Sequence, residues 1–432
     1  MTRKMKDSGI EWIGEIPEDW KTKKLKYIGI LTANGVDKKI QKDEKLYKSV
    51  HYMNVYKNSL KEIGNSDDYL VVSSTNRKAD SCLLKKGDVL FTNSSETADD
   101  IGHSTVVKED LQRTLFGYHL MRFRPIHKMN LYYEKYVFGY YYLRKWFEYR
   151  SNGITRYGVS YSDFADARII LPPLEQQIPI ANYLDNKCTK IDETIEKQKQ
   201  VVEKLKEYKQ SIITEAVTKG LNDNVKMKDS GVEWIGEIPE HWKVKRLKYE
   251  FKIKKNIAGK EGYAILSVTQ SGIKIKDISN NEGQISRDYS KYQLVEVNDY
   301  IMNHMDLLTG FVDCSKYNGV TSPDYRVFYL TNKNRDKDYY KYVFQCCYVN
   351  KVFYGLGQGV SGLGRWRLQT DKFLNFNIPV PSNEEQSKIA QYINKKQISI
   401  DKAITKKQKL IEKLTEYKKS LIYECVTGKR EI

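Results

Sequence analysis

The sequence predicts an α+β fold in which two similar, mixed α/β domains are separated by two long helices that form an antiparallel coiled coil. Two internal repeats lead to this prediction. The first relates residues 5–27 to residues 227–249, at an offset of 222, with 19 of 23 positions identical. The second relates residues 180–218 to residues 389–427, at an offset of 209, with 19 of 39 positions identical. The chain is therefore one unit of sequence written twice: an opening segment, a body and a long helix.

Length and charge limit the class of protein. The 432 residues suffice for two to four domains that each bury a core. The net charge of +18 favours a polyanionic partner, because Lys and Arg displace counterions from phosphates. A soluble, lysine-rich protein without such a partner is the alternative. The sequence has no apolar run of transmembrane length, so we expect no membrane contact and a cytoplasmic location.

Short runs rich in Val, Ile, Tyr and Phe predict strands in both bodies. These runs are Tyr69–Val72, Asp88–Phe91 and His119–Phe123 in the first body, and Tyr263–Val268, Asp299–Met302 and Arg326–Leu330 in the second. A helix is predicted after each set, at residues 132–149 and 337–354, followed by a glycine-containing loop. Because the offset falls from 222 to 209, the second body is 222 − 209 = 13 residues shorter. The bodies share an order of elements but little sequence.

The second repeat predicts the two long helices. Residues 180–218 contain no Gly or Pro, and apolar residues recur there at alternating spacings of four and three. This spacing is typical of a coiled-coil seam. Polar residues interrupt the seam at equivalent positions, Gln198 and Lys407, and Lys209 and Lys418, where they would help to fix the register. The alternative is that each stripe packs on its own domain.

Connectivity favours antiparallel pairing. A helix of about 39 residues is roughly 60 Å long, so in a parallel pair the second body would bridge that whole length. In an antiparallel pair the end of the first helix and the start of the second are neighbours. Ser382-Asn383-Glu384-Glu385 has the form of a capping box at the second helix. We expect the first regular helix to begin at Pro179, after a turn at residues 175–177.

Several kinds of chemistry lack a sequence signal. The glycine run at 355–364 does not have the phosphate-loop pattern, and Pro323-Asp324 is not followed by the acidic residues of a nuclease motif. The six cysteines form no CxxC pair, and Cys346-Cys347 lie in an apolar stretch that favours a buried, reduced pair. His51, His103, His119 and His127 form no persuasive triad, so surface or satisfied core histidines are the favoured interpretation.

The repeated junctions resemble the specificity subunit of type I restriction–modification systems. The resemblance is carried by Leu171-Pro172-Pro173-Leu174-Glu175-Gln176-Gln177 with Ile191-Asp192 downstream, by residues 12–20, and by the second copies of these segments. It implies that residues 1–170 and 222–379 are target-recognition domains 1 and 2. Residues 171–221 and 380–432 would then be the central and C-terminal spacer helices.

The resemblance implies a sequence-specific DNA-binding subunit that recognises a bipartite, gapped target. Its partners would be double-stranded DNA, two modification (methyltransferase) subunits and restriction/translocase subunits. The chain itself would not be an enzyme and would hold no cofactor or metal, while S-adenosylmethionine, ATP and Mg would bind to the partner subunits. Two alternatives stay open: an enzyme with a diverged DNA methyltransferase or nuclease activity in the same chain, and a coiled-coil scaffold that binds protein only.

Polar residues in the predicted loops are the candidates for contacts with base edges, whereas most Lys and Arg residues would contact phosphate. The candidates are Asn93, Ser94, Glu96, Arg156 and Tyr157 in the first body, and Asn303, His304, Gln358, Ser361, Arg365 and Trp366 in the second. Ordinary solvated loop residues are the alternative for each. Trp12, Trp20, Trp234 and Trp242 occur in both copies, so they cannot encode two different half-sites; we expect them to pack or to dock partner subunits.

Overall fold

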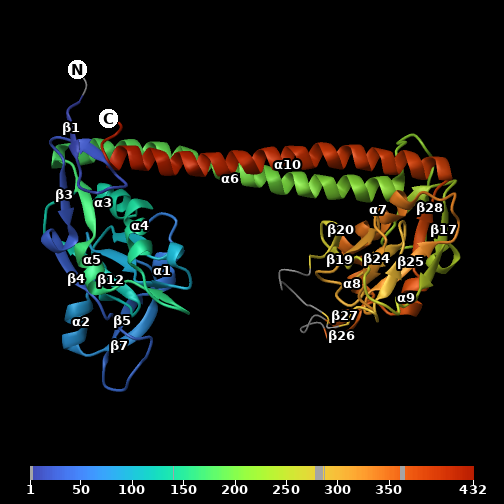
Figure 1. The fold of residues 1–432 in the computed structure, drawn as a ribbon, viewed down its shortest axis with the longest axis horizontal. Coiled ribbons are helices and arrows are strands. Elements are labelled where there is room, and N and C mark those ends of the chain that lie inside the picture. The colour runs from blue at the N-terminus through green and yellow to red at the C-terminus, as the bar shows by residue number, and fades with distance from the viewer. Residues whose placement is uncertain (1–2, 140, 278–285, 287, 361–364) are drawn as a thin grey trace. The chain divides into compact units, whose positions relative to one another are not determined.

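A computed structural model describes residues 3–139, 141–277, 286, 288–360 and 365–432. Its contacts divide the chain into two units (Figure 1). Unit 1 comprises Met1–Gln198 and Lys409–Ile432, and unit 2 comprises Lys199–Gln408. Both divisions fall inside long helices, after Gln198 and after Gln408. Each unit therefore contains one body together with a part of each helix.

Unit 1 combines short strands with helices on a repeated frame. The strands are β1 (Met5–Asp7), β2 (Glu15–Pro17), β3 (Lys21–Lys24), β4 (Gly29–Thr32), β5 (Lys45–Val50), β6 (Glu62–Ile63), β7 (Leu70–Ser74), β8 (Val89–Thr92), β9 (Ser94–Ser95), β10 (Ser104–Val107), β11 (Thr114–Phe116), β12 (Leu120–Pro125), β13 (Tyr157–Gly158) and β14 (Arg168–Leu171). The helices are α1 (Tyr52–Tyr56), α2 (Asn76–Cys82), α3 (Leu131–Phe138), α4 (Tyr141–Arg150), α5 (Tyr161–Asp166) and the first part of α6 (Leu174–Lys219). The predicted helix at 132–149 is thus two helices, α3 and α4.

Unit 2 repeats much of this order with fewer strands. The strands are β15 (Met227–Asp229), β16 (Glu237–Pro239), β17 (Lys243–Arg246), β18 (Phe251–Lys254), β19 (Leu266–Thr269), β20 (Gly272–Ile275), β21 (Gln293–Val295), β22 (Tyr300–Met302), β23 (Val312–Cys314), β24 (Gly319–Thr321), β25 (Arg326–Leu330), β26 (Gln358–Val360), β27 (Arg365–Arg367) and β28 (Asn377–Val380). The helices are α7 (Lys337–Val349), α8 (Val352–Gly355), α9 (Thr370–Leu374) and the first part of α10 (Asn383–Val426). The predicted helix at 337–354 breaks at Lys351, whose φ of 58° is left-handed.

Each body is built around one main, mostly antiparallel sheet. In unit 1 the order is β4-β12-β8-β10-β6, and in unit 2 it is β18-β25-β22-β23. All neighbours in these sheets are antiparallel except β6, which pairs with β10 in parallel. Aromatic residues fill the space beneath the sheets: Phe91 packs on Phe138, Phe147 and Phe164 in unit 1, and Phe328 on Tyr300, Phe344 and Phe373 in unit 2.

The repeated segments form the same frame in both units. Strand β3 pairs with β14 so that Lys21 faces Leu171, and β17 pairs with β28 so that Lys243 faces Val380. These partners are related by the two offsets, because 21 + 222 = 243 and 171 + 209 = 380. The two registers are therefore identical. The frame joins the opening segment of each copy to the strand that leads into its long helix.

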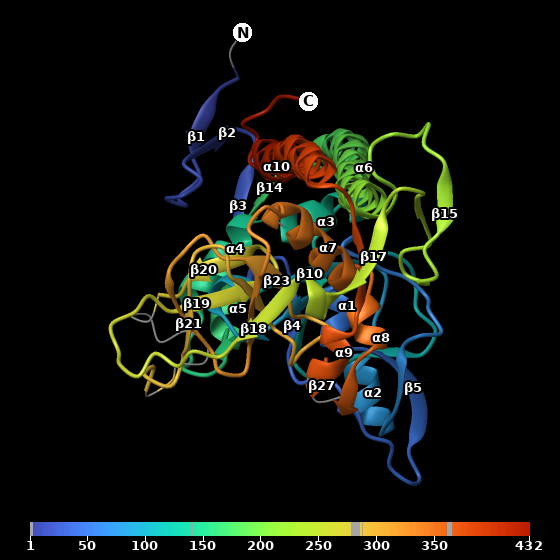
Figure 2. The same ribbon diagram turned by 90° about the vertical axis from the view of Figure 1, so that its right-hand side faces the viewer.

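The long helices run antiparallel within each unit, as the connectivity argument predicted (Figures 1 and 2). In unit 1 the Lys418 ammonium lies 2.5 Å from the Asp192 carboxylate, and in unit 2 the Lys209 ammonium lies 2.8 Å from the Asp401 carboxylate. The two ion pairs occupy equivalent repeat positions, since Asp192 and Asp401, like Lys209 and Lys418, differ by 209. The predicted polar seam positions 209 and 418 thus carry matching ion pairs across the helix pair.

The seam also packs against the bodies. Leu184, Leu421 and Cys425 are fully buried in the core of unit 1, and Ala216 and Ile393 are buried in the core of unit 2. Both interpretations of the apolar stripe therefore hold at once: it forms the helix–helix contact along the pair and a helix–body contact near the helix ends. All six cysteines are buried and free, as expected for Cys346 and Cys347.

The start of the first long helix differs from the prediction. Helix α6 begins at Leu174, so residues 175–177 are helical and Pro179 lies inside the helix. A proline in the sixth helical position lacks the N–H that would bond to the carbonyl of Glu175. At the helix start, the Gln176 and Gln177 N–H groups bond to the Pro173 carbonyl and hold the first turn. The predicted capping box at Ser382 is confirmed: the Glu385 N–H donates to Ser382 Oγ at 3.2 Å, and the Ser382 N–H donates to the Glu385 carboxylate at 3.1 Å.

An indole hydrogen bond ties the opening segment to each helix start. Trp20 Nε1 donates to Gln176 Oε1 at 2.8 Å, and Trp242 Nε1 donates to Glu385 Oε1 at 3.1 Å. Both tryptophans are 1% exposed, so the repeated Trp20 and Trp242 serve packing. Burial would raise the pKa of Glu385, but hydrogen bonds from His241, Ser382 and Trp242 outweigh it and lower the pKa to about 2.

This difference between Gln176 and Glu385 predicts a pH dependence. The folded-state pKa of Glu385 is depressed, so its stabilising contribution is present above about pH 4.5 and is lost as the pH falls toward 2. For this partly exposed carboxylate we expect about 1–2 kcal/mol at pH 7. In thermal unfolding of the full chain, Glu385→Gln should lower the apparent Tm at pH 6, lower it by a smaller amount at pH 3, and change it little at pH 2.

The matched control is the double change Asp19→His, Gln176→Glu, because Gln176 Nε2 donates to the Asp19 carboxylate where unit 2 has His241 beside Glu385. This variant should acquire acid sensitivity that the wild-type unit 1 lacks at this site. An equal Tm difference between wild type and Glu385→Gln at both pH values would contradict the assignment of the charge-assisted bond.

Candidate nucleic-acid interface

Strands β8 and β22 lie in the interior of the two main sheets, and a polar residue follows each of them at an equivalent place. Gly87 and Asn298 both precede these strands with left-handed φ angles of 85° and 78°. The N–H of Gly87 bonds to the Val107 carbonyl, and the N–H of Asn298 bonds to the Ser315 carbonyl, each at 2.8 Å. With the two turns aligned, Asn93 after β8 corresponds to His304 after β22.

These two residues share a backbone hydrogen bond, but their side chains differ. The Asn93 carbonyl accepts a hydrogen bond from the Val159 N–H, and the His304 carbonyl accepts one from the Leu368 N–H, both at 3.0 Å. Val159 and Leu368 are again 209 residues apart. Within the described part of the chain, Asn93 Oδ1 and His304 Nδ1 are buried and have no hydrogen-bond partner. Each unit therefore presents one differing, unsatisfied polar side chain from a shared backbone position.

The structure brings the candidates of the first body together. Strand β13 pairs with β9 so that Tyr157 faces Ser95 and Gly158 faces Ser94, which joins the loop after β8 to the loop at 151–158. Ser94 Oγ is buried without a partner among the described residues, whereas Glu96 and Arg156 are exposed. Burial raises the pKa of Tyr52, and the charges of Arg156 and Glu96 act on the same hydroxyl with opposite signs.

The candidates of the second body also converge, but fewer of them are free to bind. The Trp366 carbonyl accepts a bond from the Leu307 N–H, so the loop after β22 contacts the β26–β27 hairpin. Trp366 Nε1 donates to the Tyr354 carbonyl at 2.8 Å, which holds the indole in place. Asn303 Oδ1 accepts from the Met305 N–H in a local turn. Gln358 is exposed and Arg365 begins β27, while Ser361 lies outside the described residues. The role of all eleven candidates in DNA contact stays a prediction.

His51 lies at the same site but is not among the candidates predicted from the sequence. The interpretation as a surface or satisfied core histidine fits His103, whose Nε2 lies 2.8 Å from the Asp100 carboxylate. His51 is only 6% exposed, and neither ring nitrogen has a partner within the described residues. Its ring lies against Gly117, where a side chain would collide with it. A buried histidine with no partner has no local sequence signal, because its environment comes from strands that are distant in the chain.

Cations surround the neutral polar groups in both units. Burial, and then the charge of Lys38, lower the pKa of His51 to about 4. Burial lowers the pKa of His304 to about 4, with smaller contributions from Arg326, Arg367 and Lys255. Both imidazoles are therefore neutral at pH 7, and each offers one donor and one acceptor. A neutral hydrogen-bonding group among cations suits a ligand that combines phosphates with polar base edges.

The described residues contain no group of three or more His, Cys, Asp or Glu side chains arranged to hold a metal ion. None of their helices is long and apolar enough to cross a membrane.

Comparisons with known proteins show which chains this one is similar to. Residues 17–215 match the family model of the type I restriction modification DNA specificity domain. A putative type I restriction enzyme MjaX specificity subunit of Methanocaldococcus jannaschii is 30% identical over 247 residues, which are 56% of this chain and 55% of that protein. The MjaVIII specificity subunit of the same organism is 30% identical over 246 residues, 53% of this chain and 55% of that protein. The chain thus spans about half the length of these relatives.

Solved structures show the same fold. One solved chain comes from work on the complex assembly and conformational transition of the type I R-M system. It has a TM-score of 0.71 at 13% identity, and the aligned part covers 96% of this chain and 99% of that chain. The HsdS subunit from Thermoanaerobacter tengcongensis has a TM-score of 0.53 at 12% identity and covers 96% and 98%. Residues 17–215 are therefore similar to the type I restriction modification DNA specificity domain. The chain shares its fold with the two solved chains.

The pKa of His51 gives a direct test of this site. Because its folded-state pKa is about 4, the ring should stay neutral between pH 5 and 8, whereas an ordinary histidine titrates near 6.5. The unfolded chain then binds the proton more tightly, so this group destabilises the fold as the pH falls from about 6.5 toward 4. In NMR spectra of ¹⁵N-histidine-labelled chain, the signal missing from His51→Gln should not shift between pH 8 and 5. A titration midpoint near 6.5 would show that the ring is solvated.

Proposed function

We propose that this chain is the DNA-binding specificity subunit of a type I restriction–modification system, and that it recognises a bipartite, gapped sequence. The observation that carries the proposal is the pairing of a repeated frame with differing side chains at one equivalent position, Asn93 in unit 1 and His304 in unit 2. A repeated frame of this kind can position two different base-reading side chains in the same way, one for each half of the DNA target. The net charge of +18 supports the phosphate contacts that DNA binding needs.

The partners follow from the same proposal. We infer that two modification (methyltransferase) subunits dock on the two copies of the repeated frame and that restriction/translocase subunits complete the nuclease. S-adenosylmethionine, ATP and Mg would bind to those subunits, and this chain would recognise DNA without catalysing a reaction. Its site of action would be the cytoplasm, where chromosomal DNA is accessible. Binding of S-adenosylmethionine by the purified chain alone would contradict the non-catalytic role.

Exchange of a whole body tests the two-unit proposal. Replacing residues 28–170 by the body of another specificity subunit should change one half of the methylated sequence and leave the other half intact. The reason is that the retained frame positions each reader independently. The measurement is a map of methylated adenines in host DNA, which reports both half-sites and the gap.

The matched control is exchange of residues 250–379, the equivalents of 28–170 by the two repeat offsets, which should change the other half-site only. The wild-type chain must itself direct methylation to a bipartite motif for the proposal to stand. Changes in both half-sites after one exchange would refute independent reading by the two units.

Point substitutions at the equivalent positions give a finer test. Asn93→Ala should weaken discrimination in one half-site, and His304→Ala in the other, each by about 1–3 kcal/mol. The measurement is the affinity of the full chain with its modification subunits for duplexes that carry single base changes. Thr97→Ala, in the exposed part of the loop of unit 1, is the control and should leave discrimination unchanged. Equal loss for all duplexes would indicate phosphate contact instead of base reading.

A further inference from the structure

The frame tryptophans Trp12 and Trp234 occupy one repeat position but have different neighbours in the two units. In unit 2 the Trp234 ring stacks on Phe376, with the ring centres 5.5 Å apart and an angle of 13° between the planes. Its Nε1 donates to the Asn377 carbonyl at 3.2 Å. Trp234 is therefore engaged by the start of β28 and the residue before it.

The equivalent tryptophan of unit 1 is less engaged. The positions equivalent to the two neighbours of Trp234 hold Ala167 and Arg168, and alanine offers no ring to stack on. Trp12 meets Trp146 of α4 instead, with the ring centres 6.3 Å apart and the planes tilted by 39°. Within the described residues the Trp12 indole N–H makes no hydrogen bond, and Trp12 is 45% exposed. This copy of the frame tryptophan is therefore open to a ligand.

A cavity of about 340 Å³ lies beside Trp12. The opening segment contributes residues 9–12 to its wall, and helix α4 contributes Trp146 and Arg150. A tryptophan of the repeated frame and a tryptophan of the body therefore line one hollow. Its volume is near the lower end of the range for ligand sites, which suits a single aromatic side chain.

Two arginines add positive charge to this cavity. The Arg150 guanidinium lies 4.7 Å from the centre of the Trp146 ring, which is the geometry of a cation–π contact. Arg168 Nη1 donates to the Gly9 carbonyl at 2.9 Å. Among the described residues neither guanidinium forms an ion pair, so both keep N–H groups for a carboxylate.

The lining carboxylates do not neutralise these arginines. Asp166 lies 3.0 Å from the Lys24 ammonium and 2.8 Å from the Lys26 ammonium, so its charge is already balanced. Glu11 is exposed and forms no ion pair in the described part of the chain. Two free guanidinium groups thus stand against one free carboxylate, and the cavity favours an anionic group.

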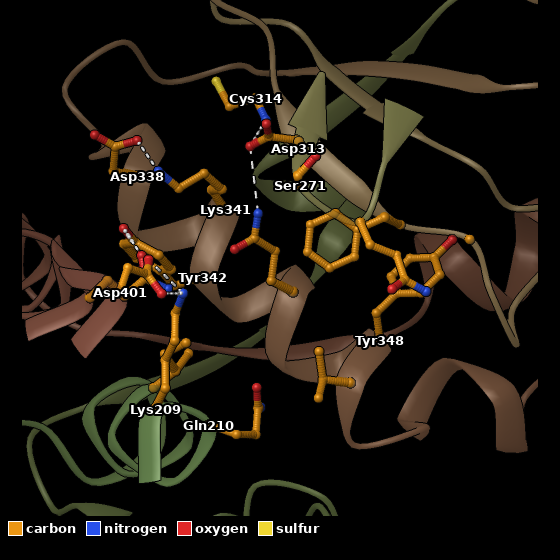
Figure 3. A pocket seen from close by; sticks show the side chains of 18 of the residues that line it. Lys209, Gln210, Ser271, Asp313, Cys314, Asp338, Lys341, Tyr342, Tyr348 and Asp401 are labelled. Carbon is orange, nitrogen blue, oxygen red and sulfur yellow. Dashed lines mark hydrogen bonds and ion pairs between the residues drawn. The ribbon is translucent and has the colours of Figure 1, made fainter. Parts of the chain in front are cut away.

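Cavity volume alone does not identify such a site. A cavity of about 1060 Å³ in unit 2 is larger, but two of its lysines pair with its own aspartates (Figure 3). Lys209 lies 2.8 Å from Asp401, and Lys341 lies 2.8 Å from Asp338. The smaller cavity of unit 1 is marked by an exposed tryptophan next to two unpaired arginines.

We propose that the cavity beside Trp12 binds an aromatic side chain of a partner polypeptide, together with a neighbouring acidic residue that pairs with Arg150 and Arg168. Tryptophan and arginine are enriched at the energetic centres of protein–protein interfaces. The chain itself supports an aromatic occupant, because a phenylalanine covers the equivalent tryptophan in unit 2. Duplex DNA fits less well, since its bases would have to leave the stack to reach the tryptophans.

This docking site goes beyond DNA reading and distinguishes the two copies of the frame. In unit 2 the frame tryptophan is already covered, and Asn377 stands where unit 1 has Arg168. A partner that uses the site would therefore bind to unit 1 and not to unit 2.

The probe is the capped peptide acetyl-Gly-Asp-Phe-Asp-Gly-amide, added to the full chain with ¹⁵N-labelled indole groups. The indole N–H signals of Trp12 and Trp146, assigned with Trp12→Phe and Trp146→Phe variants, should shift saturably, because a ring placed against them changes their magnetic environment. The signals of Trp234 and Trp242 in unit 2 are the internal controls and should not move. Replacing the phenylalanine of the peptide by alanine should weaken binding by at least about tenfold, because the ring is the anchor.

Charge reversal in the cavity wall tests the acidic neighbour. Arg150→Glu should weaken binding of the peptide by at least about fivefold, because attraction becomes repulsion. Lys145→Glu makes the same change of charge on α4 outside the cavity lining, and it should change the affinity by less than about 1.5-fold. Arg150 is exposed, so the variant should keep its fold, which unmoved signals of Trp20 and Trp242 would show.

Three results would each overturn the proposal: no saturable shift at Trp12, equal binding of the alanine peptide, or equal effects of Arg150→Glu and Lys145→Glu. Displacement of the peptide by a single-stranded oligothymidylate would also overturn it and would assign the cavity to nucleic acid. These measurements use the chain without duplex DNA, so their failure would leave two-unit DNA reading intact.

Discussion

The hydrogen bond from a buried indole to the start of a long helix is the interaction on which each unit depends. Trp20 bonds to Gln176 and Trp242 to Glu385, which joins the two repeats that the sequence separates by an entire body. The strand pairs β3–β14 and β17–β28 then close with one register. Everything between the joined ends is free to vary as long as its ends meet at this point. This constraint explains why the opening segment and the helix repeat so closely while the bodies do not.

Features that depend on local sequence and connectivity could be predicted from the sequence, and features that depend on distant contacts could not. The repeats and the spacing of apolar residues predicted both long helices, their antiparallel pairing and the capping box at Ser382, because these features depend on local sequence and connectivity. The central strands at Asp88–Phe91 and Asp299–Met302 were also close to β8 and β22. Strand β6 was missed, because two residues hold no periodic signal and its partner β10 lies about forty residues away. The helix start at Leu174 was missed because Pro179 dominated the local pattern, although tertiary contacts hold the first turn.

The candidate site was predictable in position but less so in chemistry. Loops after strand ends carry polar residues, so Asn93 and His304 stood out, and the structure places them at one equivalent backbone position. His51 could not be separated from His103 in the sequence. Both are histidines in the first body, but Asp100 satisfies His103, while His51 lies against Gly117 without a partner among the described residues. The hydrogen-bond partner, and not residue type, makes the difference between these side chains.

The differences between the units are as informative as the repeats. The frame is the same in both units, so the differences lie in the bodies. Beside the corresponding strands β10 and β23 the neighbours differ: unit 1 places Glu62 and Ile63 of β6 there, whereas in unit 2 the Ile273 N–H of β20 bonds to the Asp313 carboxylate of β23. A backbone ladder in one body and a side-chain bridge in the other thus occupy the same place. The frame therefore fixes the ends of each body and leaves its internal contacts to the differing sequence.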